Sequence, residues 1–196
     1  MATTLIGLIG LKRSGKDTYA ARLVAEHGFT RLALADPMRD AALALDPIVN
    51  VYDAGDEWGG IFTERLSEVV ARVGWDRAKE EYPEVRRTLE RLGTEVGRDI
   101  FGEDSWLGIT DAKVSATPGP VVITDVRFPN EYEWIKRRGG VLVRVIRPGV
   151  TLAAEPHSSE LLAADLDGYP ADRTVINGST ITDLHVHADD IVEVLR

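Results

Sequence analysis

The glycine-rich segment Gly10–Thr18, with the sequence GLKRSGKDT, constrains the fold of this chain more than any other feature. It matches the G-x-x-x-x-G-K pattern of loops that bind phosphate groups. Residues 4–9, which precede it, form a nearly continuous apolar run of the kind typical of a strand buried on both faces. From Lys16 onward the spacing of apolar residues predicts an amphipathic helix. A loop between such a strand and a helix start directs backbone N–H groups at an anion, so the segment predicts phosphate binding.

Several residues of this loop are each expected to take a distinct part in phosphate binding. Gly10 and Gly15 let the backbone turn tightly and approach a phosphate closely. Lys16 is expected to span the terminal phosphates, where its charge offsets the negative charge that develops during phosphoryl transfer. Asp17 stands where serine or threonine is usual, and its carboxylate is a hard oxygen ligand suited to Mg²⁺. Thr18 is then expected to contact a phosphate.

Two further cations, Lys12 and Arg13, lie inside the loop next to Ser14. Their position predicts that they reach the phosphates of two nucleotides, and Ser14 is expected to belong to the same phosphate site. The alternative interpretation of Lys12 and Arg13 is a solvated basic pair on the surface.

The rest of the chain alternates apolar runs with amphipathic segments. The strands are predicted at residues 4–9, 29–34, 121–124, 141–146 and 174–176. The helices that accompany them are predicted at residues 16–27, 36–45, 130–138 and 181–195. Buried strands that alternate with helices predict an α/β fold with a parallel five-stranded sheet and helices on both faces. We expect one domain over residues 1–196, with its core at about 1–45 and 119–196.

Two stretches interrupt this predicted core. Residues 46–118 have a mostly helical pattern, with helices predicted at residues 64–73 and 84–100. Residues 148–172 are polar and irregular, as expected of a lid that excludes water. Both stretches follow the carboxyl ends of strands, where folds of this class bind their ligands.

Charge and composition exclude several classes of protein. The net charge of −9 over 196 residues argues against a protein that coats nucleic acid, because such binding depends on an excess of basic side chains. The chain has no cysteine, which excludes disulfides, thiolate zinc sites and cysteine nucleophiles. No run approaches the roughly 20 apolar residues of a membrane helix. These features predict a soluble, intracellular protein with no membrane partner.

Two charged residues follow the third predicted strand. Asp125 ends that strand, where a carboxylate can hold Mg²⁺ or its water ligands. The alternative for Asp125 is a turn or a helix cap. Arg127 lies two residues further on, at the same ligand-facing edge, and its alternative is a surface ion pair.

Five blocks of sequence, taken in order, give the chain a recognisable family. They are Lys12–Thr18, Val85–Arg87 with Leu92–Glu95, Asp125–Arg127, Val145–Gly149, and Asn177–Gly178 before the last helix. In this order they resemble the phage deoxynucleoside monophosphate kinases. The resemblance spans nearly the whole chain, except for residues 46–82.

The resemblance implies a P-loop kinase core with a nucleotide-monophosphate-binding insert, at about residues 46–118, and a short lid. It implies ATP and Mg²⁺ on the loop and a deoxynucleoside monophosphate as acceptor, with Asp17 and Asp125 at the metal. The charges at the transferred group would come from Lys12, Arg13, Lys16 and Arg127. The remaining ATP contacts would come from Arg147, Asn177 and Gly178. The acceptor would be bound by Asp36, Arg39, Arg87 and Arg127, with Arg87 favoured over Arg86 as the residue that faces the cleft. Trp106 is added to this set because its neighbours Asp104 and Ser105 are polar.

Alternatives to this function remain at the level of sequence. The chain could be a P-loop kinase for another phosphorylated metabolite, such as phosphomevalonate or dephospho-coenzyme A. It could also be a regulatory module that binds ATP without transfer, although arginines beyond the loop argue for a second phosphate site. The resemblance also favours a homodimer that binds small nucleotides and no nucleic acid polymer. It further implies the cytoplasm, that of the host if the chain is phage-encoded.

Overall fold

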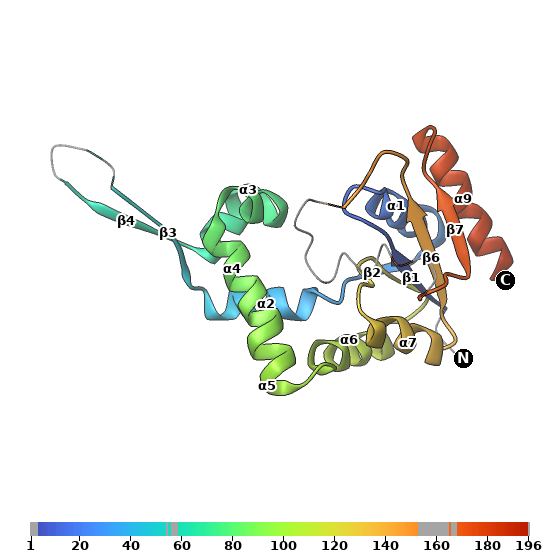
Figure 1. Ribbon diagram of the computed structural model, residues 1–196, viewed down its shortest axis with the longest axis horizontal. Helices are drawn as coiled ribbons and strands as arrows, with labels where there is room; N and C mark the ends of the chain where they lie inside the picture. Colours follow the sequence, from blue (N-terminus) through green and yellow to red (C-terminus); the bar gives the residue numbers. More distant parts are fainter. Residues whose placement is uncertain (1–3, 54, 56–58, 153–164, 166–167, 196) are drawn as a thin grey trace. The chain divides into compact units, whose positions relative to one another are not determined.

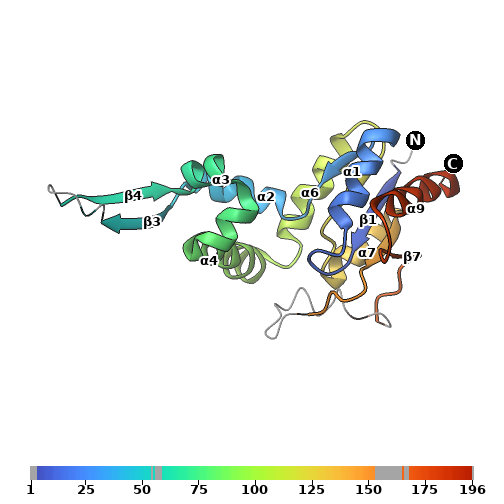
Figure 2. The same ribbon diagram turned by 90° about the horizontal axis from the view of Figure 1, so that it is seen from above.

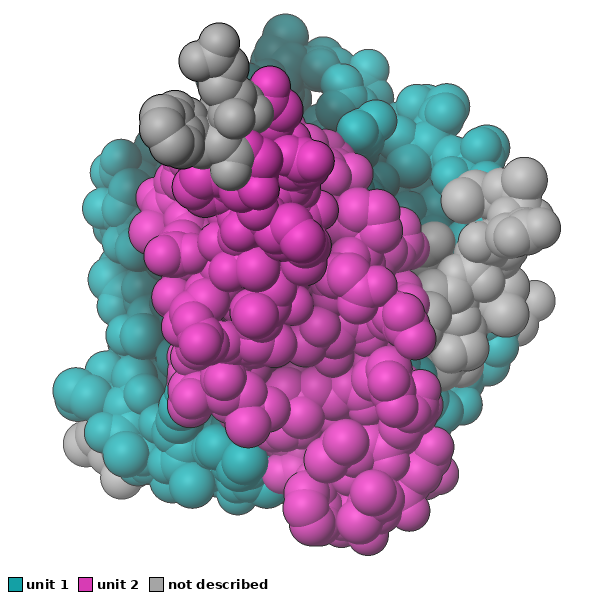
Figure 3. All heavy atoms as spheres, turned by 90° about the vertical axis from the view of Figure 1, so that its left-hand side faces the viewer, with its two compact units in different colours: residues 1–34, 107–196 teal, residues 35–106 magenta. Residues whose placement is uncertain are grey.

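The computed structural model describes residues 4–53, 55, 59–152, 165 and 168–195. The chain forms two compact units, which Figure 3 distinguishes by colour. We call residues 1–34 with 107–196 the core unit and residues 35–106 the insert unit. Most of the predicted lid, residues 153–164 and 166–167, lies outside the described residues. Among the described helices, none combines the length and the apolar character that a membrane crossing requires.

The core unit contains a five-stranded parallel sheet, as predicted (Figure 1). Its strands are β1 (Leu5–Ile9), β2 (Thr30–Leu32), β5 (Val121–Ile123), β6 (Val141–Ile146) and β7 (Arg173–Ile176). Their order across the sheet is β2-β5-β1-β6-β7. The chain leaves β1 toward one side of the sheet and later returns to the other side. The loop after β1 therefore lies at the switch point where open α/β sheets bind ligands.

Helices cover both faces of this sheet because alternate residues of its strands point to opposite sides. On one face, α1 (Lys16–His27) and α9 (Ile181–Val194) pack against Ile6 and Leu8 of β1 (Figure 2). On the other face, α6 (Ser105–Ala116) and α7 (Pro129–Arg137) pack against Leu5 and Ile9. Both clusters consist of buried hydrophobic side chains, so the central strand is buried on both faces as its sequence predicts.

Local signals fix the ends of α1 and α9, the two helices that pack on the same face of the sheet. Helix α1 ends at Gly28, whose left-handed conformation, with φ at 69°, suits a residue without a Cβ. Helix α9 begins after Thr180, whose hydroxyl accepts a hydrogen bond from the backbone N–H of Asp183 at 3.2 Å. An ion-pair cluster then ties α9 to α1, because Asp189 accepts hydrogen bonds from Nε and Nη2 of Arg22, each at 2.9 Å.

The insert unit has its own small core. Its elements are α2 (Asp36–Leu45), β3 (Ile48–Asp53), β4 (Ile61–Arg65), α3 (Leu66–Glu81), α4 (Pro83–Arg91), the π-helix η1 (Leu92–Arg98) and α5 (Asp99–Phe101). Buried apolar side chains from α2, β3, α3 and α4 form the core of this unit; they are Ala42, Val49, Leu66, Val69, Ala78, Val85 and Leu89.

The antiparallel hairpin of β3 and β4 differs from the mostly helical pattern expected after residue 46. Alternating β-branched and aromatic residues on both sides of a glycine-containing turn are the signal for a hairpin, and here they outweigh the helical period. Tyr52 lies opposite Phe62, and their rings stack with centroids 5.8 Å apart. The helix predicted from Glu64 therefore begins at Leu66, after the second strand has ended at Arg65.

The helix predicted over residues 84–100 is continuous in the chain but changes its geometry. It runs as α4 to Arg91, continues as the π-helix η1 to Arg98 and closes with the short helix α5. A period of 3.6 residues cannot indicate such a widened turn, because the extra residue shifts the pattern only locally.

Candidate active site

The glycine-rich loop joins the end of β1 to the start of α1, and its two outer glycines are sterically required. A Cβ on Gly10 would lie 2.4 Å from the carbonyl oxygen of Val145 in β6. A Cβ on Gly15 would lie 2.4 Å from Nδ2 of Asn177, and the φ of Gly15 is 108°. The loop therefore lies directly against neighbouring backbone and side chain, and only glycine fits at these two positions.

Lys16 and Ser14 give this loop the character of an anion site. The Nζ of Lys16 donates hydrogen bonds to the carbonyl oxygens of Gly10 at 2.7 Å and Leu11 at 2.8 Å, so the ammonium lies over the loop. Ser14 is only 1% exposed, and its Oγ has no hydrogen-bond partner among the described residues. A buried hydroxyl and an ammonium on one loop that opens a helix are chemically suited to a phosphate group.

Asn177 connects the far strand of the sheet to the loop. Its backbone N–H donates to the carbonyl oxygen of Ile146 at 2.7 Å, and its Nδ2 donates to the carbonyl oxygen of Ser14 at 2.9 Å. The sequence predicts that Asn177 contacts ATP. In the structure its amide holds the phosphate loop, a role that sequence reasoning missed because β7 and the loop are more than 160 residues apart.

The other residues predicted on the ATP side lie on the same unit. Arg147 and Gly178 are exposed; Arg147 directly follows β6, and Gly178 is the second residue after β7. Asp17 and Thr18 lie in the first turn of α1. Lys12 and Arg13 are exposed within the loop, and Arg13 has a positive φ of 67°. Their ligand contacts stay predictions.

Asp125 and Arg127 follow β5, the strand next to β1. The Oδ1 of Asp125 accepts a hydrogen bond from the backbone N–H of Leu34 at 2.7 Å. The N–H of Val126 donates to the carbonyl oxygen of Leu8 at 3.2 Å, which fixes this segment beside the central strand. The carboxylate of Asp125 thus lies at the carboxyl edge of the sheet, as expected for a residue that follows β5.

Glu131 is a supporting residue that sequence reasoning missed. It is only 8% exposed, and its Oε2 accepts hydrogen bonds from the backbone N–H groups of Arg127 at 2.6 Å and Phe128 at 3.0 Å. It thereby fixes the backbone from which the exposed Arg127 side chain extends. The signal was present, since Pro129 followed by Glu131 is typical of the first turn of a helix.

The residues predicted at the acceptor lie mainly on the insert unit. Arg39 is 3.4 Å from Asp36, and its guanidinium lies over the ring of Trp75, 5.7 Å from the centroid. Arg87 lies 3.1 Å from Glu84. Trp106 donates its indole N–H to the carbonyl oxygen of Gly93 at 3.1 Å.

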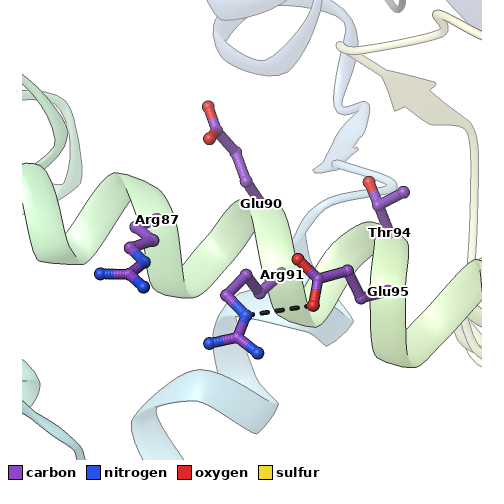
Figure 4. A pocket seen from close by; sticks show the side chains of 5 residues that line it. All are labelled: Arg87, Glu90, Arg91, Thr94 and Glu95. Carbon is purple, nitrogen blue, oxygen red and sulfur yellow. Dashed lines mark hydrogen bonds and ion pairs between the residues drawn. The ribbon is translucent and has the colours of Figure 1, made fainter.

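A concave surface on α4 and η1 distinguishes the two adjacent arginines of the insert unit. It has a volume of about 530 Å³ and is lined by Arg87, Glu90, Arg91, Thr94 and Glu95 (Figure 4). Arg86 is not among these residues, and its Nε donates to Glu90 at 2.9 Å. Arg87 therefore lines the concave surface, whereas Arg86 does not.

The carboxylates of the core unit can be compared with what magnesium requires. Within the described part of the chain, no three His, Asp or Glu side chains come together as a metal site. Mg²⁺ usually keeps several waters and takes one or two carboxylates beside substrate phosphates. Asp17, at the start of α1, and Asp125, at the edge of the sheet, are carboxylates of the kind that such a site uses.

The sheet order, the glycine-rich loop at the switch point and Lys16 over that loop together define a P-loop kinase. A putative deoxynucleotide monophosphate kinase of Acanthamoeba polyphaga mimivirus is 30% identical over 190 residues, which cover 92% of each chain. The deoxynucleoside-5'-monophosphate kinase of Escherichia phage T5 is 44% identical over 52 residues, which cover 26% of this chain and 21% of that protein. The protein belongs to the deoxynucleotide monophosphate kinase family.

The solved structures are less similar to the chain than these relatives are. No protein-family model matches the chain. TT1252 from Thermus thermophilus aligns over the full length of both chains, with a TM-score of 0.48 and 17% identity. A dephospho-CoA kinase from Campylobacter jejuni aligns over 97% of this chain and 96% of its own, with a TM-score of 0.44 and 13% identity.

Proposed function

We propose that the protein transfers the γ-phosphoryl group of ATP to a deoxynucleoside monophosphate. The observation that carries this proposal is the loop at the end of β1, with Lys16 over it and a buried hydroxyl within it. In a member of this kinase family, such a loop is suited to the phosphates of a nucleoside triphosphate. Kinases with this loop use ATP and usually Mg²⁺.

The transfer requires no general base. A phosphate oxygen of the acceptor attacks the γ-phosphorus, and the bond from that phosphorus to the oxygen that bridges it to the β-phosphorus breaks. The products are ADP and a deoxynucleoside diphosphate. The attacking oxygen is already an anion, so the work of the protein is positioning and charge neutralisation. In this proposal Lys12, Arg13, Lys16 and Arg127 supply the positive charge.

The two substrates divide the remaining residues between them. Ser14, Gly15 and Thr18 bind the phosphates of ATP, and Asn177 holds their loop. Arg147 and Gly178 make the remaining contacts with ATP. Asp36, Arg39, Arg87 and Arg127 hold the acceptor. Magnesium, when bound, neutralises charge on the phosphate oxygens, and Asp17 and Asp125 would hold the ion or its waters.

A substrate panel tests this function. ADP release is measured with dAMP, dGMP, dCMP, dTMP and the matching ribonucleotides, and the diphosphate product is identified by chromatography. Phosphomevalonate and dephospho-coenzyme A serve as competing acceptors. We expect turnover with at least one deoxynucleotide. Turnover with only a competing acceptor would reassign the enzyme, and ATP binding without ADP release would indicate a regulatory module.

A further inference from the structure

Helix α3 is interrupted by a kink at Gly74. This glycine has a φ of 76° and a ψ of 164°, a left-handed conformation that a residue with a Cβ adopts only under strain. Before the kink, Val73 is the last residue of α3 that packs against the core of the insert unit. A regular helix would bring Asp76 and Arg77 to this face next, because residues three and four apart share a face. Both are exposed, and Trp75 packs against the core instead, so the kink turns the indole inward.

The indole of Trp75 lies against Arg39 of α2. The guanidinium carbon of Arg39 is over the ring, 5.7 Å from its centroid, which is within the range of a cation–π contact. Nη1 of the same guanidinium donates to the carboxylate of Asp36 at 3.4 Å. One contact thus uses the face of the guanidinium, and the other uses one of its N–H groups.

Burial distinguishes Arg39 from the arginines of α4. Its side chain is 23% exposed, whereas that of Arg87 is 64% exposed and pairs with Glu84 in water. A cation–π contact becomes stronger as water is removed from the cation, while exposed ion pairs contribute little. Trp75 therefore restrains Arg39 more firmly than Glu84 restrains Arg87.

We propose that Trp75 is a positioning residue that holds the guanidinium of Arg39 in place for the acceptor nucleotide. This inference rests on the proposed function, which assigns Arg39 to the acceptor, and it deepens that function by adding a residue that acts through Arg39. Trp75 lies within residues 46–82, the stretch that carries none of the family resemblance.

Stacking on an aromatic ring suits this role. The N–H groups of a guanidinium lie in its plane, so a ring against its face leaves the planar fork available to a ligand. An arginine side chain has many rotamers, and a ligand that fixes it must offset the lost entropy. Because Trp75 restricts Arg39 before the ligand binds, it should lower the KM for the acceptor. It should leave kcat unchanged, since the same contact is present before and during the transfer.

Trp75→Leu tests the contact, because it keeps an apolar side chain in the core and removes the ring. Tyr82→Leu is the matched control, since Tyr82 packs against the same core and its ring lies 6.0 Å from the guanidinium of Arg72. The probe is whichever of dAMP, dGMP, dCMP and dTMP the wild type uses best. We expect Trp75→Leu to raise the KM for this monophosphate by about fivefold, the scale of a partly buried cation–π contact. Its kcat and its KM for ATP should stay at the wild-type values, and Tyr82→Leu should change none of the three.

Trp75→Phe tests whether the ring itself matters. Phenylalanine keeps an aromatic face but attracts a cation less strongly than tryptophan does, so the KM for the monophosphate should rise by only about twofold. Thermal unfolding of each variant shows whether it is folded at the assay temperature. If Trp75→Phe and Trp75→Leu raised the KM equally, the aromatic contact would have no part in binding and the inference would be wrong.

A double variant tests whether Trp75 acts through Arg39. Arg39→Met removes the cation, so adding Trp75→Leu to it should raise the KM for the monophosphate no further. The same fivefold rise in both backgrounds would show that Trp75 acts independently of Arg39, for example by contacting the substrate, and would overturn the positioning role.

The outcomes separate this inference from the function on which it rests. A wild type that phosphorylates no deoxynucleotide overturns the proposed function, and the inference with it. If the wild type is active but Arg39→Met keeps its KM for the monophosphate, or Trp75→Leu behaves like Tyr82→Leu, the function stands and the inference is wrong. If Trp75→Leu does not fold, Trp75→Phe alone and combined with Arg39→Met decides, since its twofold rise must be lost in the combination.

Discussion

The core unit and the insert unit hold their predicted binding groups in different ways. In the core unit, the phosphate loop is fixed by backbone contacts and by the amide of Asn177, and Lys16 is bonded to two loop carbonyls. In the insert unit, Arg87 and Arg91 are exposed and paired with carboxylates of their own helical segment. The loop is therefore preorganised for a ligand, whereas the exposed arginines would have to exchange weak ion pairs to bind one.

Lys16→Ala should give the largest effect and would test whether the core unit carries the transfer. We expect kcat to fall by about a hundredfold or more, the usual loss for one preorganised charge, while the far-UV circular dichroism stays that of the wild type. Lys79→Ala is the control, because Lys79 makes a surface pair with Asp76 on the insert unit, 3.3 Å apart. If Lys16→Ala kept more than about a tenth of the wild-type turnover, the loop could not be the transfer site.

Arg127→Lys should give the next largest effect, because Arg127 is predicted to bind the acceptor although it lies on the core unit. Its side chain is exposed, but its backbone N–H donates a hydrogen bond to the buried Glu131 at 2.6 Å. We expect kcat/KM for the monophosphate to fall by about thirtyfold or more, as for one lost preorganised donor, while the dissociation constant of ATP is unchanged. Arg31→Lys is the control, because Arg31 is an exposed arginine on β2 of the same unit. Equal losses of affinity for ATP and for the monophosphate would assign Arg127 to the ATP site instead.

The same contrast between units appears in what the sequence predicts. In the core unit, helix α1 and strand β6 match their predicted residues, because caps and buried apolar runs are local signals. In the insert unit, the hairpin and the π-helix were missed, since one depends on cross-strand pairing and the other on a tertiary contact with Trp106. The loop motif indicated the phosphate site, but the bond from Asn177 to the loop joins residues far apart in sequence.

Asn177→Ala should have a smaller effect that falls on one substrate. Removing the amide leaves the carbonyl oxygen of Ser14 without this donor and loosens the loop. We expect the KM for ATP to rise by about fivefold, in line with one neutral hydrogen bond, and the KM for the monophosphate to stay unchanged. Asn50→Ala is the control, because Nδ2 of Asn50 donates a hydrogen bond to Glu64 at 2.7 Å on the insert unit. This variant should leave the KM for ATP unchanged. A rise in the KM for ATP in both variants would remove the distinction between the units.

The smallest expected effect concerns stability in acid. It depends on Asp189 of α9, which pairs with Arg22 and His27 of α1 in the core unit. Hydrogen bonds from Arg22, and then from His27 at 2.7 Å, lower the pKa of Asp189 from 3.8 to about 2. A carboxyl group whose pKa is lower in the folded than in the unfolded state stabilises the fold at pH values above its unfolded-state pKa. This contribution is complete above about pH 4 and is lost as the pH falls toward 2.

Asp189→Asn should therefore lower the thermal unfolding midpoint at pH 5 and flatten its decline between pH 4 and pH 2, because the asparagine has no proton to gain in that window. Glu193→Gln is the matched control, since it removes one exposed carboxylate from the same helix, α9. The midpoint is followed by circular dichroism at each pH, and the control should decline in parallel with the wild type. If Asp189→Asn also declined in parallel, the cluster that ties α1 to α9 would contribute no more to stability than the exposed pairs of the insert unit, and the contrast between the two units would be limited to the loop.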